Sequence, residues 1–585
     1  MMKENLKKVQ KALMKGGFHS VEASQWRKSI RLIGKVDTWD QKIEAGYLSA
    51  HKGFKAVIND IEVKNITEEK ITIPNIEDNL LENREFDAAI IGGGVIGCAI
   101  ARELSQYNIS VVLLEKEEDL AKHASGRNDG MVHDGFAASP GSLKAHYNVR
   151  GNRLYDDLCK DLEIDFIRPG NMILFSTPFS KLLLPFMNSR SKKNDVDGFY
   201  YISRKEVAKR EPQIIEKQYG AYVLPSAGVL SPYKLTIALA ENAAANGVEI
   251  IFNAAVTGFE IDSQSIKTIK SNRGNFKAKT VINAAGIWAD YIAGLADDRF
   301  FSLHGRKGVD AILDLKTGKY QKSSYAMPPL TQAHSKTKGG GLVITPEGNI
   351  LVGPTAKEVS TREDYSTNSD DIKDLQHHID LNTKLSKSDI ITYFAGIRAC
   401  TYEEDFIIEP SEEITNLIYA AGIQSPGFAS APAIAEDIRD MVLEKLSLNI
   451  KVDLKENYNP KRRAIPNCKN MLLKDRDELI KENPSYGRIV CRCEEISEGE
   501  IRDALKSPIS VTTVDGLKRR VRVTAGRCHG GFCTPRILEI MAEENNSEIS
   551  SLTKKGKGSE IIFGDTKDDV SYENVSIKSL AMEAQ

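Results

Sequence analysis

Residues 86–115 constrain the fold more than any other part of the chain. An apolar strand there leads into Gly92, Gly94 and Gly97, spaced G-x-G-x-x-G, and then into a helical run and a second strand. The first glycine permits a tight turn, the second lets a pyrophosphate approach the backbone, and the third lets the helix pack on the strand. Glu115 closes the second strand, about 20 residues on, where a carboxylate can bond ribose hydroxyls. The segment therefore predicts a Rossmann-type dinucleotide site.

The chain of 585 residues holds one clear copy of this motif. At about 100–200 residues per domain, its length predicts roughly three to five units, and residues 85–447 alternate apolar and helical runs as one large α/β unit. Gly339–Gly341 supply glycines, but they lie in a polar loop with no strand before them. One dinucleotide site in so large a unit favours tightly held FAD, reduced directly by a small substrate rather than by NADH.

Charge and composition exclude several classes of partner. The 79 basic and 81 acidic residues give a net charge of -2, so no basic field for nucleic acid is expected. No apolar run reaches the ~18 residues of a membrane-spanning helix, so membrane contact would run through a partner. The charged first residues lead into no apolar leader, which predicts a cytoplasmic protein. Four of the eight cysteines gather near the C-terminus, which favours metal or redox chemistry over disulfides.

Residues 1–66 are expected to form a small α+β module, with helices near 4–15 and 38–50 and strands near 30–33 and 56–63. The pattern resembles a BON domain, a small bacterial module linked to surface or ligand attachment; an unrelated α/β cap is the alternative. Composition predicts the remaining boundaries. They are a linker at 67–84, a second linker at 448–486, a cysteine-bearing domain at 487–545 and a tail at 546–585.

Several segments between residues 125 and 427 resemble the D-amino-acid-oxidase-like FAD superfamily. The loop 125–135 resembles its flavin-contacting loop, 281–286 its later strand–glycine turn, and 422–427 the turn that covers the flavin ring. Residues 349–356 and 393–398 resemble two segments of its substrate domain. The resemblance implies a Rossmann-type FAD-binding domain with an interleaved antiparallel-sheet substrate domain. It also implies further FAD contacts: Ser125, Gly126, Arg127, Asn128, Val256, Ala285, Gly286, Gly422, Ile423 and Gly427.

Different parts of the chain resemble two branches of that family. Residues 140–145, 353–356 and 422–427 resemble L-2-hydroxyglutarate oxidases and dehydrogenases, whereas the C-terminus resembles the large subunit of anaerobic glycerol-3-phosphate dehydrogenase. The latter enzymes carry Arg-Tyr after the loop histidine and Gly-Gly-Lys near the flavin turn. This chain has Phe136-Ala137 and Ile423-Gln424 there. Two expected phosphate-side cations are missing, which argues against a phosphorylated substrate.

The resemblance implies a dehydrogenase that oxidises a small anionic secondary alcohol by hydride transfer to FAD. An L-2-hydroxy acid such as 2-hydroxyglutarate and glycerol 3-phosphate are the expected substrates. Arg398 is the expected anchor for the anion, because a guanidinium grips a carboxylate through two parallel hydrogen bonds. A structural ion pair of Arg398 with Asp405 or Glu403 is the alternative.

His133 is the first candidate for the base that takes the hydroxyl proton, and His304 is the second. Lys307 is expected to add positive charge near the substrate or the flavin. The same fold also oxidises C–N bonds, so an amino-acid or amine dehydrogenase is a rival. A non-catalytic redox sensor that holds flavin and cluster is a rival of another class.

The C-terminal cysteines predict a small helical [2Fe–2S] domain. Cys491 and Cys493 form C-x-C, and Cys528 and Cys533 form C-x4-C in a glycine-rich loop. Four thiolates from two short loops suit such a cluster, and structural zinc is the alternative. The segment resembles the bacterioferritin-associated-ferredoxin-like [2Fe–2S] domain. Since such a cluster carries one electron at a time, we expect electron export to a second flavin subunit, a small redox protein or a quinone reductase.

Overall fold

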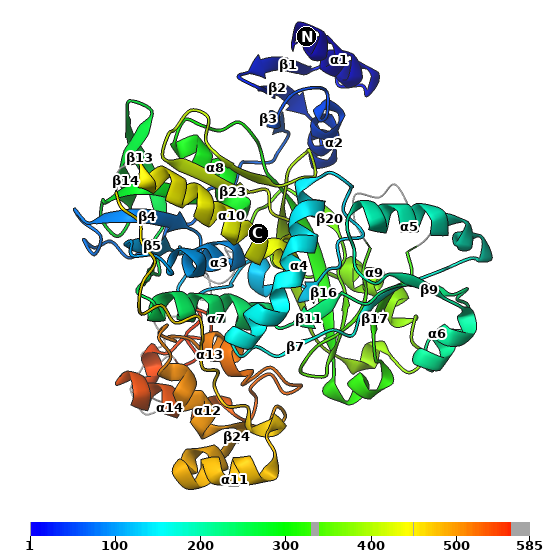
Figure 1. The fold of residues 1–585 in the computed structure, drawn as a ribbon, viewed down its shortest axis with the longest axis vertical. Helices are drawn as coiled ribbons and strands as arrows, with labels where there is room; N and C mark the ends of the chain where they lie inside the picture. Colours follow the sequence, from blue (N-terminus) through cyan, green and yellow to red (C-terminus); the bar gives the residue numbers. More distant parts are fainter. Residues whose placement is uncertain (1, 329–338, 449, 563–585) are drawn as a thin grey trace, which may run out of the picture. The chain divides into compact units, whose positions relative to one another are not determined.

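The computed structural model describes residues 2–328, 339–448 and 450–562, and the chain divides into two compact units, Met1–Ala464 and Ile465–Gln585 (Figure 1). Most of the expected tail at 546–585 therefore lies outside the described residues. Among the described residues, no helix combines the length and apolar character that crossing a membrane requires.

The first unit begins with a small α+β module, as expected. Its sheet has the order β1-β2-β3, in which β1 and β2 are antiparallel and β2 and β3 are parallel. Thr38 caps the crossover helix, accepting a hydrogen bond from the N–H of Gln41, whose side chain bonds back in a capping box. The elements are α1 (Met2–Lys15), β1 (Val21–Trp26), β2 (Ser29–Val36), α2 (Trp39–Ser49) and β3 (Val57–Val63).

Strand β1 of this module was not expected from the sequence. Its residues, VEASQW, bury only Val21 fully, so the strand lacks the apolar alternation that marks the other two. The strand exists because β2 offers it an antiparallel partner from Val21 to Trp26. The resemblance of the module to a BON domain stays a prediction.

A six-stranded sheet of order β12-β5-β4-β15-β23-β22 forms the nucleotide-binding layer. All neighbouring pairs in it are parallel except β22 with β23. Helices α3, α7 and α10 pack together beside the sheet, and α8 contacts β15 (Figure 1). The elements are β4 (Glu85–Ile91), α3 (Val95–Leu104), β5 (Val111–Leu114), α7 (Pro232–Ala245), β12 (Glu249–Ile251), β15 (Lys277–Asn283), α8 (Ala289–Leu295), β22 (Ile407–Pro410), β23 (Leu417–Ala421) and α10 (Gly427–Ser447).

A second large sheet is built from the segments between these strands, which confirms the interleaved substrate domain. Its order is β20-β16-β19-β18-β17-β8-β10-β9, with β21 also paired to β16. Its pairs are antiparallel except β17 with β8. The elements are β8 (Asn171–Leu174), β9 (Tyr200–Ile202), β10 (Ala221–Leu224), β16 (His304–Leu313), β17 (Ser324–Ala326), β18 (Gly341–Ile344), β19 (Ile350–Gly353), β20 (Lys357–Val359) and β21 (Ile390–Cys400).

Smaller elements complete the first unit. Helix α4 packs along α10. A three-stranded sheet of order β6-β11-β7 contacts α10 through β6. The elements are β6 (Met131–Val132), α4 (Leu143–Asp161), β7 (Phe166–Ile167), the 3-10 helix η2 (Pro178–Leu183), α5 (Leu184–Lys193), α6 (Arg204–Arg210), β11 (Gly228–Leu230), β13 (Val256–Asp262), β14 (Ser265–Ser271) and α9 (Ser369–Ile379).

The second unit is a small, mainly helical domain, as expected. Its core gathers Val490, Ile501, Leu517 and Ile537 from different elements. A two-stranded ribbon carries the first cysteine pair at its turn. The elements are α11 (Leu473–Glu482), β24 (Ile489–Cys491), β25 (Ile496–Ser497), α12 (Glu498–Leu505), α13 (Val514–Val521) and α14 (Thr534–Asn545).

Candidate functional site

The glycine turn between β4 and α3 leaves no room for side chains. Gly92 has φ +112°, and a Cβ there would lie 2.5 Å from the carbonyl oxygen of Ala284. A Cβ on Gly97 would lie 1.9 Å from the carbonyl oxygen of Gly92, because helix and turn touch through backbone. Gly94 is the N-cap of α3 and offers no side-chain cap. The helix N-terminus is thus exposed to whatever occupies the turn, which suits a pyrophosphate.

Glu115 stands at the end of β5, where the sequence predicted a ribose-binding carboxylate. Its carboxylate accepts hydrogen bonds from the N–H of Gly93 at 2.8 Å and of Glu117 at 2.9 Å. Burial raises the pKa of Glu115 above its ordinary value. The two backbone bonds hold the side chain at the glycine turn, where it lines a long pocket.

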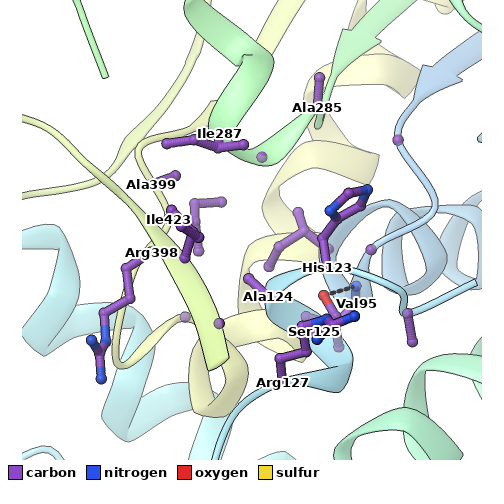
Figure 2. A pocket seen from close by; sticks show the side chains of 18 of the residues that line it. Val95, His123, Ala124, Ser125, Arg127, Ala285, Ile287, Arg398, Ala399 and Ile423 are labelled. Atoms are coloured by element: carbon purple, nitrogen blue, oxygen red, sulfur yellow. Dashed lines mark hydrogen bonds between the residues drawn. The ribbon is translucent and has the colours of Figure 1, made fainter. Parts of the chain in front are cut away.

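Most of the predicted FAD contacts line this pocket. Figure 2 shows Ser125, whose Oγ accepts a 2.8 Å hydrogen bond from the N–H of Val95, with Arg398 and Ile423 at another part of the wall. The predicted residues on the wall are Gly92, Gly94, Glu115, Ser125, Arg127, Asn128, Val256, Ala285, Gly286, Ile423 and Gly427.

Gly97, Gly126 and Gly422 are predicted contacts that do not line the pocket. A Cβ on Gly126 would lie 2.0 Å from the carbonyl oxygen of Ala121, and Gly422 has φ +64°. These glycines therefore shape the backbone behind the wall. The N-terminus of α3 at the glycine turn, a buried carboxylate and a long apolar wall fit the phosphates, ribose and ring system of FAD.

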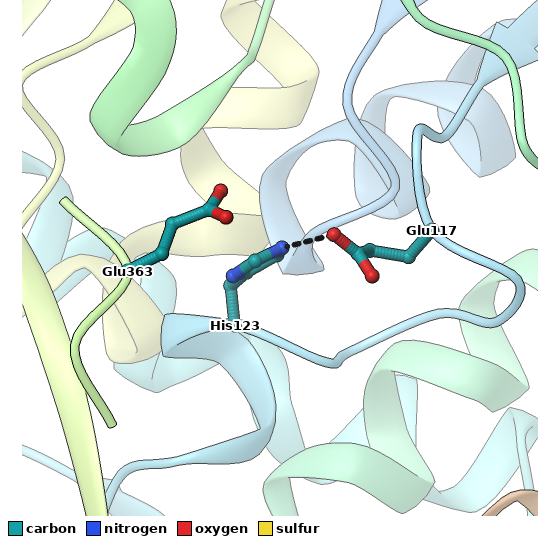
Figure 3. A group of neighbouring side chains, drawn as sticks. All are labelled: Glu117, His123 and Glu363. Atoms are coloured by element: carbon teal, nitrogen blue, oxygen red, sulfur yellow. Dashed lines mark hydrogen bonds and ion pairs between the residues drawn. The ribbon is translucent and has the colours of Figure 1, made fainter. Parts of the chain in front are cut away.

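Glu117, His123 and Glu363 cluster beside the pocket, with ligand atoms within 4.8 Å of one another (Figure 3). Lys116 pairs with Glu363 at 2.9 Å and Lys122 with Glu117 at 2.9 Å. Although burial opposes the charged form, His123 and the two lysines hold the pKa of Glu117 well below its usual range. The carboxylates are therefore already neutralised by lysines, and the cluster is an ion-pair network.

A second cavity adjoins the flavin pocket and opens over the substrate sheet. Both have His133, Arg398 and Gln424 on their walls. The junction of the two cavities is therefore where a small substrate could meet the flavin ring. The structure brings His133 and Arg398, the first-choice base and the predicted anchor, to this junction.

Arg398 lies on β21 opposite Arg306 on β16, and its guanidinium covers Gly308. A Cβ on Gly308 would lie 2.7 Å from Arg398 Nη1, so the glycine makes room for the cation. Its hydrogen bond to the carbonyl oxygen of Thr355 is long at 3.4 Å. Within residues 2–328, 339–448 and 450–562, no carboxylate forms an ion pair with Arg398. Asp405 instead accepts the backbone N–H groups of Leu143 and Lys144.

His304 and Lys307, the other two predicted catalytic residues, line neither cavity. His304 Nδ1 bonds Glu358 at 2.7 Å, and its Nε2 lies 3.2 Å from the hydroxyl of Tyr47. Lys307 lies on the opposite face of β16 from Arg306, where its Nζ bonds Asp364 at 2.8 Å. The structure does not bring either residue to the junction.

A polar network beneath the flavin turn was not anticipated from the sequence. We call Tyr47, His304, Arg306, Glu358, Glu404 and Gln424 the Tyr47 network. The Tyr47 hydroxyl donates to Glu404 at 2.7 Å and accepts from Arg306 at 2.6 Å. Arg306 bonds Glu404 and Glu358 at 2.6 and 2.7 Å, and the Gln424 amide donates to Glu404 at 2.6 Å.

The Tyr47 network is largely buried, and Lys144 adds a second cation beside it, 3.4 Å from Glu404. Burial works to raise the pKa of Glu404, but Arg306 and Lys144 lower it to about 2. Tyr47 comes from α2, so the N-terminal module supplies one member of a network that reaches Gln424 at the cavity junction. No local pattern marks Tyr47, because its partners lie more than 250 residues away along the chain.

Two carboxyl groups that were not predicted to lie at the site, Asp310 and Glu403, face the cavities. Asp310 lines the flavin pocket, and its Oδ1 has no hydrogen-bond partner in the described part of the chain. Burial raises its pKa well above the ordinary value. Glu403 lines the second cavity, where burial raises its pKa to about 7. Neither signal exists in the sequence, because both depend on burial by distant segments.

The four predicted cluster ligands converge in the second unit. Cys491 Sγ lies 3.8 Å from Cys493 Sγ, which lies 3.7 Å from Cys528 Sγ. A Cβ on Gly526 would lie 2.4 Å from Cys493 Sγ, so this glycine makes room for the thiol. The Cys533 pKa is lowered, first by a hydrogen bond with Cys491. Four converging thiols, of which Cys528 and Cys533 have a lowered pKa, fit a [2Fe–2S] cluster.

Comparisons with known proteins agree with both halves of this geometry. Residues 87–441 match the FAD dependent oxidoreductase family, and residues 489–543 match the BFD-like [2Fe-2S] binding domain. A glycerol 3-phosphate dehydrogenase of Caloramator mitchellensis is 38% identical over 488 residues, which is 83% of this chain and 100% of that protein. An L-2-hydroxyglutarate dehydrogenase of Escherichia coli is 29% identical over 283 residues, 48% of this chain and 66% of that protein.

Among solved structures, a dithionite-reduced L-alpha-glycerophosphate oxidase from Mycoplasma pneumoniae with FAD bound has a TM-score of 0.60 and 29% identity, covering 65% of this chain and 98% of that one. Fold and pocket thus define a flavoprotein oxidoreductase. The chain belongs to the FAD-dependent oxidoreductase family, and it carries a C-terminal BFD-like [2Fe-2S] binding domain. Its cofactors are FAD and a [2Fe–2S] cluster.

Proposed function

We propose that the protein is a dehydrogenase of a small anionic secondary alcohol, with glycerol 3-phosphate the favoured substrate, and that it exports electrons through the [2Fe–2S] cluster. The observation that carries the proposal is Arg398, a guanidinium with no carboxylate partner in the described residues, at the junction of the two cavities. A half-buried cation that pairs with no carboxylate among the described residues is stabilised when an anionic ligand supplies the counter-charge.

A second cation supports a phosphorylated substrate, which the sequence analysis had argued against. Arg190 on α5 lines the second cavity and, in the described residues, pairs with no carboxylate. Its Nε and Nη2 donate to the carbonyl oxygens of Phe136 and Ala137 at 2.9 and 2.6 Å. These are the two positions where related enzymes carry Arg-Tyr, so Arg190 replaces the missing cation from another element.

His133 is the proposed base. It lines both cavities, so one imidazole nitrogen can take the hydroxyl proton of an alcohol whose anion is held by Arg398. Its backbone carbonyl accepts the side-chain amides of Asn148 and Asn152 at 2.6 and 2.9 Å, which fixes the loop that carries the imidazole. Bound FAD supplies the two-electron acceptor for the hydride.

The cluster domain supports electron export to a partner protein. Cys528 is exposed, and Phe532 beside it is 56% exposed with Arg492 over its ring at 4.2 Å. An exposed aromatic flanked by arginine is typical of protein-binding surfaces. We propose a second flavin subunit, a small redox protein or a quinone reductase as the acceptor. We also propose a cytoplasmic location, since none of the eight cysteines is in a disulfide, as expected in a reducing compartment.

The domain limits proposed are 1–66 for the N-terminal module, 67–84 for a linker, 85–447 for the flavoprotein, 448–486 for a second linker, 487–545 for the cluster domain and 546–585 for the tail. The compact units meet at Ala464 and Ile465, inside the proposed second linker.

Anaerobic reduction of the bound flavin, with no electron acceptor added, tests the substrate. Purified holoenzyme is mixed with glycerol 3-phosphate, L-2-hydroxyglutarate or an amino acid, and loss of flavin absorbance is followed. We expect the fastest loss with glycerol 3-phosphate. Faster loss with L-2-hydroxyglutarate or with an amino acid would move the assignment to that class. No loss with any of them would leave the redox-sensor alternative.

Cys528→Ser tests the export route. We expect the variant to lose the reduced-state electron paramagnetic resonance signal of the cluster while its flavin is still bleached by substrate. Retention of the full signal would remove Cys528 from the ligand set.

A further inference from the structure

An apolar ridge projects from η2 and α5 into solvent. It consists of Phe179, Leu182, Leu183 and Phe186, which are 72%, 78%, 41% and 62% exposed. Their spacing of three, one and three residues puts them on one side of a helical segment. Large apolar side chains normally turn such a stripe toward the core, whereas here the described residues leave it uncovered, as they would a surface that binds a partner.

The inner side of the same segment is fixed to the first unit. Met187 is buried and packs with Phe175 and Tyr222, with Leu184 against the same cluster. The Ser191 hydroxyl lies 2.9 Å from the hydroxyl of Tyr222. The segment therefore has two apolar sides. One is packed against the first unit, and the other is exposed among the described residues.

The segment that forms the ridge carries positive charge only, and the exposed Asp195 and Asp197 that follow it pair with Arg153. Residues 176–194 contain four basic residues and no Asp or Glu, although the whole chain has a net charge of -2. Lys181, Lys192 and Lys193 are exposed, and the described residues give none of them an ion pair. Exposed lysines beside aromatic and leucine side chains are the composition of helices that lie in the surface of an anionic bilayer. Protein interfaces, by contrast, are depleted in lysine.

We propose that the apolar ridge and its three lysines form a docking surface for an anionic lipid membrane. The four apolar side chains enter the boundary between headgroups and acyl chains, and the lysines pair with lipid phosphates. This attachment is peripheral and independent of any spanning helix. It does not depend on which substrate the enzyme oxidises.

The ridge also borders the second cavity, whose wall includes Leu183 and Phe186. Phe179 and Leu182 do not line either cavity. The lipid contact can therefore be tested at Phe179 and Leu182 without altering the substrate site.

The test is co-sedimentation of full-length holoenzyme with vesicles of phosphatidylcholine, with and without phosphatidylglycerol. We expect binding to the anionic vesicles, weaker binding to the neutral ones, and partial release by salt. The double variant Phe179→Ser/Leu182→Ser should lower the bound fraction about tenfold. Replacing Lys181, Lys192 and Lys193 by Gln should weaken binding to anionic vesicles roughly fivefold per lysine and leave neutral vesicles unaffected.

Leu448→Ser/Leu454→Ser is the matched control, because both leucines are exposed at another place on the first unit. This control should bind vesicles like the parent protein, and turnover with a soluble acceptor should persist in both double variants. The proposal is overturned if the parent protein ignores anionic vesicles or if the ridge and control variants bind equally. It is also overturned if the ridge variant converts a dimer to a monomer in sedimentation velocity without changing vesicle binding, because the ridge would then join two copies of the chain.

Discussion

Two neighbouring regions of the substrate side treat positive charge in opposite ways. In the Tyr47 network, Arg306 is closed in by Glu358 and Glu404. Arg398, directly across the β16–β21 register, and Arg190 on α5 have no carboxylate partner in the described part of the chain. Both of these unpaired arginines line the second cavity. An arginine that pairs with carboxylates of the protein, like Arg306, stabilises the fold. An arginine at a cavity wall that has no such carboxylate is available to bind an anionic ligand.

Arg398→Met should show the largest effect of this unbalanced charge. We expect kcat/KM to fall about 1,000-fold, or ~4 kcal/mol, because a buried anion would lose its partner. Arg398→Lys should recover part of the loss, since the charge returns without the planar fork. Steady-state kinetics measures both, and flavin absorbance per protein serves as the loading control. An unchanged kcat/KM would mean that Arg398 holds no substrate.

Arg190→Met should separate the two kinds of anion. We expect kcat/KM for glycerol 3-phosphate to fall about 100-fold, because a phosphate would lose one charge-assisted partner. A monoanionic 2-hydroxy acid, held by Arg398 alone, should be affected little. Equal losses for both substrates would show that Arg190 supports the loop at Phe136 and not the phosphate.

Glu403→Gln tests a carboxyl whose charge the protein disfavours. Its pKa of about 7 lies above the ordinary 4.5, so the unfolded chain ionises first as pH rises and the folded state loses stability between these values. Gln cannot ionise, so the variant should be more stable than the parent above pH 7 by about 2 kcal/mol and similar near pH 4. Urea unfolding at the two pH values measures the difference. A larger gain in stability at the lower pH would contradict the raised pKa of Glu403.

Tyr47→Phe should have the smallest effect, because Arg306 and Glu404 still bond each other after the hydroxyl is removed. We expect a loss of about 1 kcal/mol in stability and a fall in kcat/KM of less than about tenfold. Tyr200→Phe, which changes an exposed tyrosine bonded to Arg210, is the matched control and should change neither. If the two variants behave identically, the Tyr47 hydroxyl contributes no more to stability and activity than the hydroxyl of an exposed tyrosine.

The sequence predicted the parts of the site that short motifs encode. The glycine turn, Glu115 and the four cysteines are each specified within a few residues, and the structure brings them to their pocket or cluster. Lys307 was predicted to add positive charge near the substrate, but it lines neither cavity. Successive residues on a strand point to opposite faces, so Lys307 could not share the face of Arg306 and Gly308.

Other parts of the site depend on contacts between distant segments. His304 shares a face with Arg306, but Tyr47 from the N-terminal module reaches its ring and closes it off. Arg190 reaches the carbonyl oxygens of Phe136 and Ala137 because α5 folds back onto that loop. Neither contact leaves a trace in local sequence, since polar residues on helices are common whether or not they line a cavity.

The place of Tyr47 also has a consequence for how the chain is made. The N-terminal module leaves the ribosome first, yet Glu404, which accepts the Tyr47 hydroxyl, follows 357 residues later. At roughly 5–20 residues per second, that interval is on the order of 20–70 s. During this interval, the side of α2 that carries Tyr47 is exposed to water because its partners have not yet been synthesised. A ribosome paused before Glu404 would therefore display a finished module beside an unfinished enzyme.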